Sequence, residues 1–312
     1  MPEAAIVLAR FLHYASVLTL FGVSLFPLYT YPAHAGAPPE RVRRLLRSMV
    51  LLATLAALLS GCFWFACVVA GMTGTPGSVF DRDALWPVLS ETSFGKVSAA
   101  RFLIAVSLLG LIATRPTFVT TSSPRLTVGF SAALLASLAG VGHTQIHEGI
   151  ASVVHVGADG LHLLAAGAWL GGLLPLLYLV ATAVRTPSPD HQVEAGNAAL
   201  RFSGMGYVAV ATIVGSGLLN GWFLVGSVAG LIATPYGQLL MLKLCLFAGM
   251  LALAAVNRFW LVPSLIKNKE RSPNRLLFRL CAHVLGEQAL GLMIILIVSA
   301  MGTMDPAINL QG

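Results

Sequence analysis

Residues 142–175 read GHTQIHEGIASVVHVGADGLHLLAAGAWLGGLLP, a stretch that joins four of the eight histidines of the chain to a long apolar run. His155, Asp159 and His162 follow one another at spacings of four and three residues. On a helix these offsets turn the side chains by only about 40° and 20° from the first one, so all three share one face. His143 and His147, which are four residues apart, precede them.

The composition indicates the surroundings of that face. Only 10% of the 312 residues are charged and 57% are hydrophobic, whereas a soluble domain carries about 25% charged residues. We therefore expect an all-α, polytopic integral membrane protein whose main contact is the lipid bilayer. The net charge of +7 does not indicate a nucleic-acid partner, because the basic residues are confined to a few loops.

Eight segments are apolar enough to cross a membrane, since a crossing needs about 20 residues. They are Ala4–Tyr29, Leu45–Gly71, Val97–Thr114, Leu126–Val141, Val154–Ala181, Phe202–Val225, Gly237–Val256 and Val284–Met301. The sequence thus predicts a single transmembrane domain over residues 1–312, a bundle of about eight helices.

The loops after the first, third, fifth and seventh segments hold 14 of the 19 Lys and Arg residues. Basic loops remain in the cytoplasm. Both termini, and the loop with His143 and His147, are therefore predicted to lie outside.

Titratable side chains at membrane depth are costly and often mark ion pathways or cofactor sites. We predict that His143, His147, His155, Asp159 and His162 form a cation-binding cluster that opens to the outside. His162 lies about 10 Å further along the helix than His155, so two successive sites fit better than one shared ion. His13 reaches a similar depth and is expected to face them, although a lone histidine can also be a simple bridge between helices.

Other side chains at the same end of the spans extend this prediction. Met301 and Met304, three residues apart, are candidate thioether ligands, and thioether with imidazole suits copper; plain packing is the competing interpretation. Arg10, Arg101 and Lys243 either reach for the outer interface or pair with acidic groups. We expect Lys243 to pair with Asp159.

Two stretches resemble a known family. GYVAVATIVGSGLLNGW at residues 206–222 and TPYGQLLMLKLCLFAGMLALAAVNRFWLVPSL at residues 234–265 resemble the copper resistance D domain of the CopD family, and the resemblance extends over residues 202–300. The upstream stretch DGLHLLAAGAWLGGLLPL, residues 159–176, also resembles the helix that precedes that domain. The resemblance implies a multi-pass protein of the bacterial inner membrane that imports copper. It also implies a separate periplasmic CopC-like copper-binding partner.

A second interpretation belongs to another functional class. His13 and His162, on different helices at similar depth, could be the axial ligands of a haem b. Arg10, Arg101 and Lys243 would then neutralise the haem propionates. In that case the protein would be a quinol-linked oxidoreductase rather than a transporter.

Overall fold

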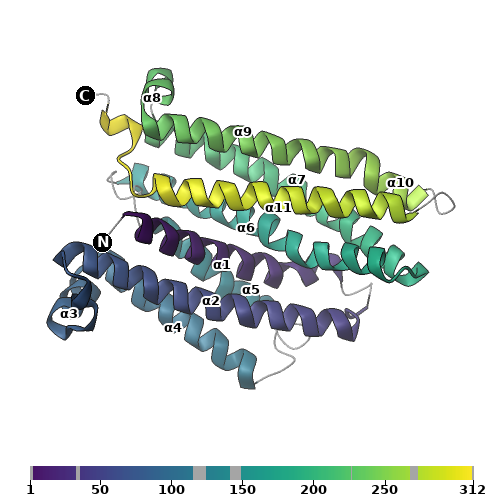
Figure 1. Cartoon of the computed structure of the whole chain (residues 1–312), viewed down its shortest axis with the longest axis horizontal. Helices are drawn as coiled ribbons and strands as arrows, with labels where there is room; N and C mark the ends of the chain where they lie inside the picture. Colours follow the sequence, from purple (N-terminus) through teal and green to yellow (C-terminus); the bar gives the residue numbers. More distant parts are fainter. Residues whose placement is uncertain are drawn as a thin grey trace.

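A computed structural model describes residues 3–32, 36–114, 124–140, 149–225, 227–267 and 273–310. All regular elements in these ranges are helices (Figure 1). The long ones are α1 (Glu3–Thr30), α2 (Glu40–Thr73), α4 (Ser93–Thr114), α6 (Ile150–Arg185), α7 (Pro189–Val225), α9 (Pro235–Val256) and α11 (Pro273–Met301). The short ones are η2 (Pro76–Phe80), α3 (Arg82–Glu91), α5 (Pro124–Ala136), η4 (Ser137–Gly140), α8 (Val228–Ala233), the π-helical η6 (Asn257–Leu261), α10 (Val262–Lys267) and η7 (Ala307–Leu310).

Within the described residues, seven helical segments are long and apolar enough to span a membrane: α1, α2, α4, α6, α7, α9 with its continuation to Ile266, and α11. The all-α, polytopic membrane fold is therefore confirmed. The predicted fourth span is the exception, because α5 and η4 together make only a shorter apolar helix, Pro124–Ala139. It still carries the chain from the end of α4 back toward the start of α6 (Figure 1).

Several helices continue beyond the predicted spans. α7 begins at Pro189, 13 residues before the apolar segment that starts at Phe202. Hydropathy marks only the part of a helix that faces lipid or core, whereas backbone hydrogen bonding continues through polar residues.

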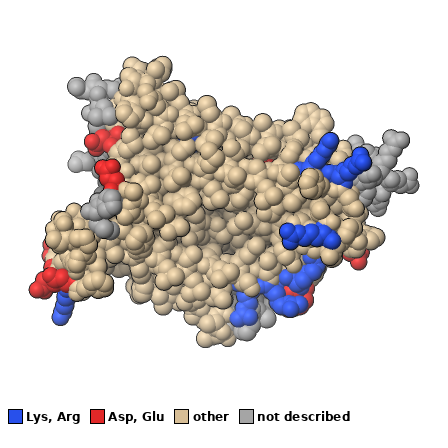
Figure 2. Space-filling model, viewed as in Figure 1, with Lys and Arg blue, Asp and Glu red and all other residues tan. Residues whose placement is uncertain are grey.

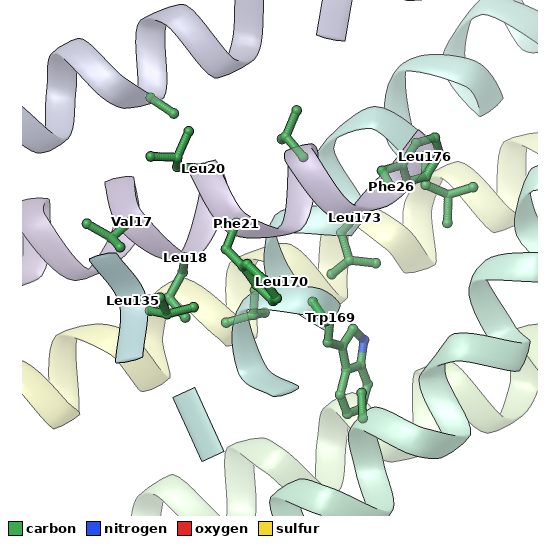
Figure 3. Packing of buried hydrophobic residues seen from close by; sticks show 14 of the residues in the cluster. Val17, Leu18, Leu20, Phe21, Phe26, Leu135, Trp169, Leu170, Leu173 and Leu176 are labelled. Atoms are coloured by element: carbon green, nitrogen blue, oxygen red, sulfur yellow. The ribbon is translucent and has the colours of Figure 1, made fainter. Parts of the chain in front are cut away.

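α1 and α6 form the centre of the bundle, and α1 also packs against α2, α5 and α11. The two central helices approach closely at Gly22 and Gly171, where a Cβ on either glycine would overlap the backbone of the other helix. Small residues at such crossings allow tight packing of membrane helices. Leu18, Phe21 and Leu135 close around Gly167 beside this crossing (Figure 3).

Lys and Arg side chains gather at the end of the bundle that holds α10 (Figure 2). α1 begins and α11 ends at the opposite end (Figure 1). Both ends of the described chain therefore lie away from the basic end. That they lie outside the cell remains a prediction from the distribution of charge.

A group of polar contacts stabilises the basic end. Glu194 on α7 accepts a hydrogen bond from the Tyr31 hydroxyl at 2.7 Å and pairs with Arg41 on α2. Arg201 on α7 also donates to the backbone oxygen of Thr30 at 2.6 Å. These contacts tie the α1–α2 connection to α7.

Candidate functional site

α6 carries three of the predicted site residues into one space. His155, Asp159 and His162 all line a cavity of about 200 Å³ between α1, α6, α7, α9 and α11. His155 is buried and the other two side chains are partly exposed to the cavity. The spacing that suggested a shared face in the sequence thus corresponds to one cavity wall.

α7 supplies a matching partner for each of these residues. The His155 ring stacks on Phe223, with ring centroids 4.7 Å apart. The Asn220 amide donates to the Asp159 carboxylate at 3.2 Å. His162 Nδ1 lies 3.0 Å from the Ser216 hydroxyl oxygen.

The partners on α7 run in the opposite chain direction to the residues of α6. From Phe223 to Asn220 to Ser216 the residue numbers fall by three and four, because α6 and α7 are antiparallel. Sequence reasoning missed these three residues. The signal that could have found Ser216 and Asn220 is the polar spacing within GSGLLNGW, residues 215–222, inside the stretch that carried the family resemblance.

The Ser216 contact holds one nitrogen of the His162 ring. When the Ser216 hydroxyl donates its single hydrogen to the backbone oxygen of Thr212, 2.5 Å away, it can only accept from His162. In that arrangement His162 donates from Nδ1, and its Nε2 keeps a lone pair. A neutral imidazole with one nitrogen held by a hydrogen bond is the usual form of a metal ligand.

α9 and α1 bring positive charge to the same cavity. Lys243 lines it and attracts the Asp159 carboxylate electrostatically. The ion pairs within 4 Å found among the described residues do not include these two side chains. Lys243 and Asp159 therefore share the cavity without direct contact. Arg10 lies on the other side, against Gly302 and over the Tyr14 ring at 5.6 Å.

The two methionines differ in position. Met301 is buried and lines the cavity, at the end where α11 finishes. Met304 packs beside a small apolar cluster formed by Met301, Val225, Tyr236 and Ala307.

The structure does not bring His13 to the α6 cluster. Its Nδ1 lies 3.2 Å from the backbone oxygen of Ala57 and 3.1 Å from the Ser60 hydroxyl, so the ring faces α2. It lines a second cavity, of about 440 Å³, together with Arg101. Arg101 donates to the side chain and backbone of Ser137 at 2.8 and 2.7 Å, and joins α4 to η4.

This arrangement does not fit the haem interpretation. One haem held by two histidines needs both rings to face a common space. The His13 ring faces Gly61 on α2, whereas the His162 ring faces Gly217 on α7. The two residues line different cavities, and Arg10 and Arg101 are divided between those cavities in the same way.

His143 and His147 lie outside the described residues. The described flanks, η4 and the start of α6, lie at the end of the bundle opposite the basic end (Figure 1). Within the described ranges, no three His, Cys, Asp or Glu side chains come together as a closed metal site. The cavity instead presents separate donors along its wall.

Comparison with known proteins is decisive for the family. Residues 1–153 match the family described as copper resistance protein D-like, N-terminal domain, and residues 196–301 match the family described as copper resistance protein D. The chain belongs to the copper resistance protein D family. The resemblance found over residues 202–300 is thereby confirmed.

Three curated relatives of this family align with the chain. Inner membrane protein YebZ of Escherichia coli (strain K12) is 30% identical over 95% of this chain and 97% of its own length. Copper transport protein CutJ of Bacillus subtilis (strain 168) is 32% identical over 80% of this chain, which corresponds to 45% of CutJ. Copper resistance protein D of Pseudomonas syringae pv. tomato is 29% identical over 98% of both chains. No solved structure matches the chain.

Family membership and the apolar helices together identify a multi-pass protein of the bacterial inner membrane. The residues of this cavity fall in different parts of the sequence relative to the two family matches. His155, Asp159 and His162 lie between the matched regions, whereas Ser216, Asn220 and Lys243 lie inside the second one. Both the segment that joins the two family regions and the copper resistance protein D region are needed to build this cavity.

Proposed function

We propose that the chain imports copper ions across the inner membrane through the cavity that His155, Asp159 and His162 line between α1, α6, α7, α9 and α11. The observation that carries the proposal is the antiparallel pairing of His155, Asp159 and His162 with side chains of α7. It gives imidazole and carboxylate groups fixed orientations on the wall of a space inside the bundle. Two relatives whose names contain copper transport and copper resistance support the choice of metal.

The donors suggest an order of contact for an ion that enters from outside. His143 and His147 receive the ion before it reaches the cavity, and a periplasmic CopC-like protein, as a separate chain, delivers it. Met301 and His155 lie nearest that entrance, followed by Asp159 and His162. Imidazole and thioether donors suit copper and disfavour magnesium and calcium. Met304 is proposed as a further thioether ligand just beyond Met301.

The charges of the cavity have complementary roles in this proposal. Asp159 lowers the cost of bringing a cation into a space of low polarity. Lys243 is not in direct contact with Asp159, but its positive charge balances that carboxylate when no copper is bound. When copper binds, the ion takes over this charge balance and Lys243 stays in place. His13 is left outside the path because its ring faces α2.

Copper accumulation in cells tests the proposal. Cells that express His155→Ala or His162→Ala should lose the copper accumulation that the unchanged protein gives, with equal amounts of protein in the membrane. His191→Ala is the matched control, because His191 lies near the basic end, where its Nδ1 lies 2.9 Å from the backbone oxygen of Thr186. Unchanged accumulation in both cavity variants would contradict the proposed path.

A further inference from the structure

A buried carboxylic acid lies outside the proposed copper path. Glu287, at the middle of α11, is only 2% exposed and lines a third cavity of about 330 Å³ between α6, α7, α9 and α11. It is about 21 Å along its helix from Pro273, counted at 1.5 Å per residue. The proposed copper path does not use it, although a buried acid at membrane depth is costly to retain.

Glu287 is held by neutral donors. The Trp169 indole donates to Oε2 at 3.0 Å, and the Asn257 amide donates to Oε1 at 2.7 Å. The ion pairs within 4 Å among the described residues do not involve Glu287. A buried carboxylate without a paired cation has a strong reason to take up a proton.

The charged and titratable groups around Glu287 are few. Arg258 lines the same cavity, but its Nε donates to the Tyr207 hydroxyl at 3.1 Å and its guanidinium lies over the Tyr207 ring. His283 lies one turn earlier on α11. Lys243 on α9, Asp159 on α6 and Arg10 on α1 line the other cavity.

Asn257 connects Glu287 to His283. Asn257 is buried in the π-helical η6, and its Oδ1 lies 2.9 Å from His283 Nδ1. Oδ1 can only accept, so His283 carries a hydrogen on Nδ1 when the Asn257 amide donates to the ionised Glu287. π-helical segments inside membrane helices often occur at functional sites.

We propose that Glu287, Asn257 and His283 form a proton-binding site in the copper resistance protein D region. When Glu287 gains a proton on Oε1, the side-chain amide of Asn257 rotates so that its oxygen and nitrogen exchange places. Glu287 then donates the new hydrogen to Asn257 Oδ1. The Asn257 NH₂ group then donates to His283 Nδ1, whose hydrogen has been released to water while Nε2 has taken one up from water. One proton is bound in total, on Glu287, and His283 stays neutral.

The role that we give to this proton-binding site in the protein rests on the proposed function, the import of copper. A cation that enters the cell needs charge compensation, and a carboxylic acid near the middle of the membrane can supply a proton in exchange. The proton site itself can be tested without copper, so its failure and the failure of the copper path are separate results.

The test is a pH titration of the copper-free, full-length protein in lipid nanodiscs, followed by infrared difference spectroscopy. As the pH falls, the unchanged protein should gain the C=O band of a neutral carboxylic acid. Glu287→Gln should lose that band, while its amide oxygen can still accept from the Trp169 indole and its NH₂ group can donate to Asn257 Oδ1. Asp159→Asn should keep the band. A band that survives in Glu287→Gln and disappears in Asp159→Asn would overturn the assignment, as would the absence of any such band.

Histidine ring vibrations test the link through Asn257. In the unchanged protein they should report a move of the ring hydrogen from Nδ1 to Nε2 with the same midpoint as the carboxylic acid band. The histidine signal should be lost in Glu287→Gln and in His283→Gln, whereas His283→Gln should keep the acid band. A histidine signal with the same pH dependence in Glu287→Gln would contradict the link.

Discussion

The Ser216 hydroxyl oxygen on α7 lies 3.0 Å from Nδ1 of His162, which lines the cavity from α6. When this hydroxyl donates to the backbone oxygen of Thr212, it accepts from Nδ1, and His162 Nε2 keeps a lone pair for an ion. A serine that touches no ion in the proposed path thus supports the nitrogen that can bind one. Such indirect support of a ligand is common around metals in proteins.

Ser216→Ala should weaken copper binding although the alanine removes no proposed ligand. Loss of a hydrogen bond that orients a ligand typically lowers metal affinity by about 10- to 100-fold. Competition titration of copper against a chelator, on purified protein, measures the change. Ser203→Ala is the control, because Ser203 is also on α7 and, within the described ranges, its hydroxyl donates to the backbone oxygen of Ala199 on the same helix. Equal copper affinities in the two variants would show that Ser216 does not orient a ligand.

Gly22→Ala should destabilise the protein, because the added Cβ would overlap the backbone of α6 at Gly167 and Gly171. Overpacking of this kind costs about 1–3 kcal/mol. Gly110→Ala, in α4, meets open space and should leave stability unchanged or slightly higher, since alanine favours a helix over glycine by about 0.5–1 kcal/mol. Thermal unfolding in detergent compares the two; a lower unfolding temperature for Gly110→Ala than for Gly22→Ala would refute the close approach.

Tyr31 should make the basic end sensitive to high pH. Burial, and then its hydrogen bond to Glu194, raises the pKa of the Tyr31 phenol well above the usual value of about 10. A raised folded-state pKa stabilises the folded protein fully below the unfolded-state pKa, and the stabilisation is lost as the pH rises beyond it.

Tyr31→Phe should therefore lower stability by about 1 kcal/mol at pH 8, where the lost hydrogen bond counts in full. The difference between the variant and the unchanged protein should shrink once the pH exceeds about 10, because only the unchanged protein then loses the contribution of Tyr31. Unfolding temperatures measured from pH 8 to pH 11 provide the comparison. A gap that widens with pH would mean that the sign of the pKa shift is wrong.

Much of the fold could be predicted because its causes are local. Apolar length located seven of the eight predicted spans, and helical spacing placed His155, Asp159 and His162 on one face. The short α5 was harder, because hydropathy reports how apolar residues 126–141 are and not where their helix ends.

Contacts between helices could not be predicted in the same way. His13 has the depth expected of a partner for His162, yet the rotation of α1 directs it toward Ser60 on α2. That rotation is set by the close crossing of Gly22 with Gly171, which depends on two helices at once. The bonds of Glu287 to Trp169 and Asn257 likewise join residues far apart in sequence, so no local pattern announces them.

Copper flux into proteoliposomes that contain only the purified chain tests the central claim most directly. The flux is measured under both reducing and oxidising conditions, and the variants are compared under the condition in which the unchanged protein is active. The unchanged protein and His191→Ala should both carry copper inward. Asp159→Asn, which keeps the size of the side chain and removes its charge, should slow the flux by about tenfold or more, a barrier increase of about 1.4 kcal/mol. Equal flux in Asp159→Asn and the unchanged protein would contradict a copper path through this cavity.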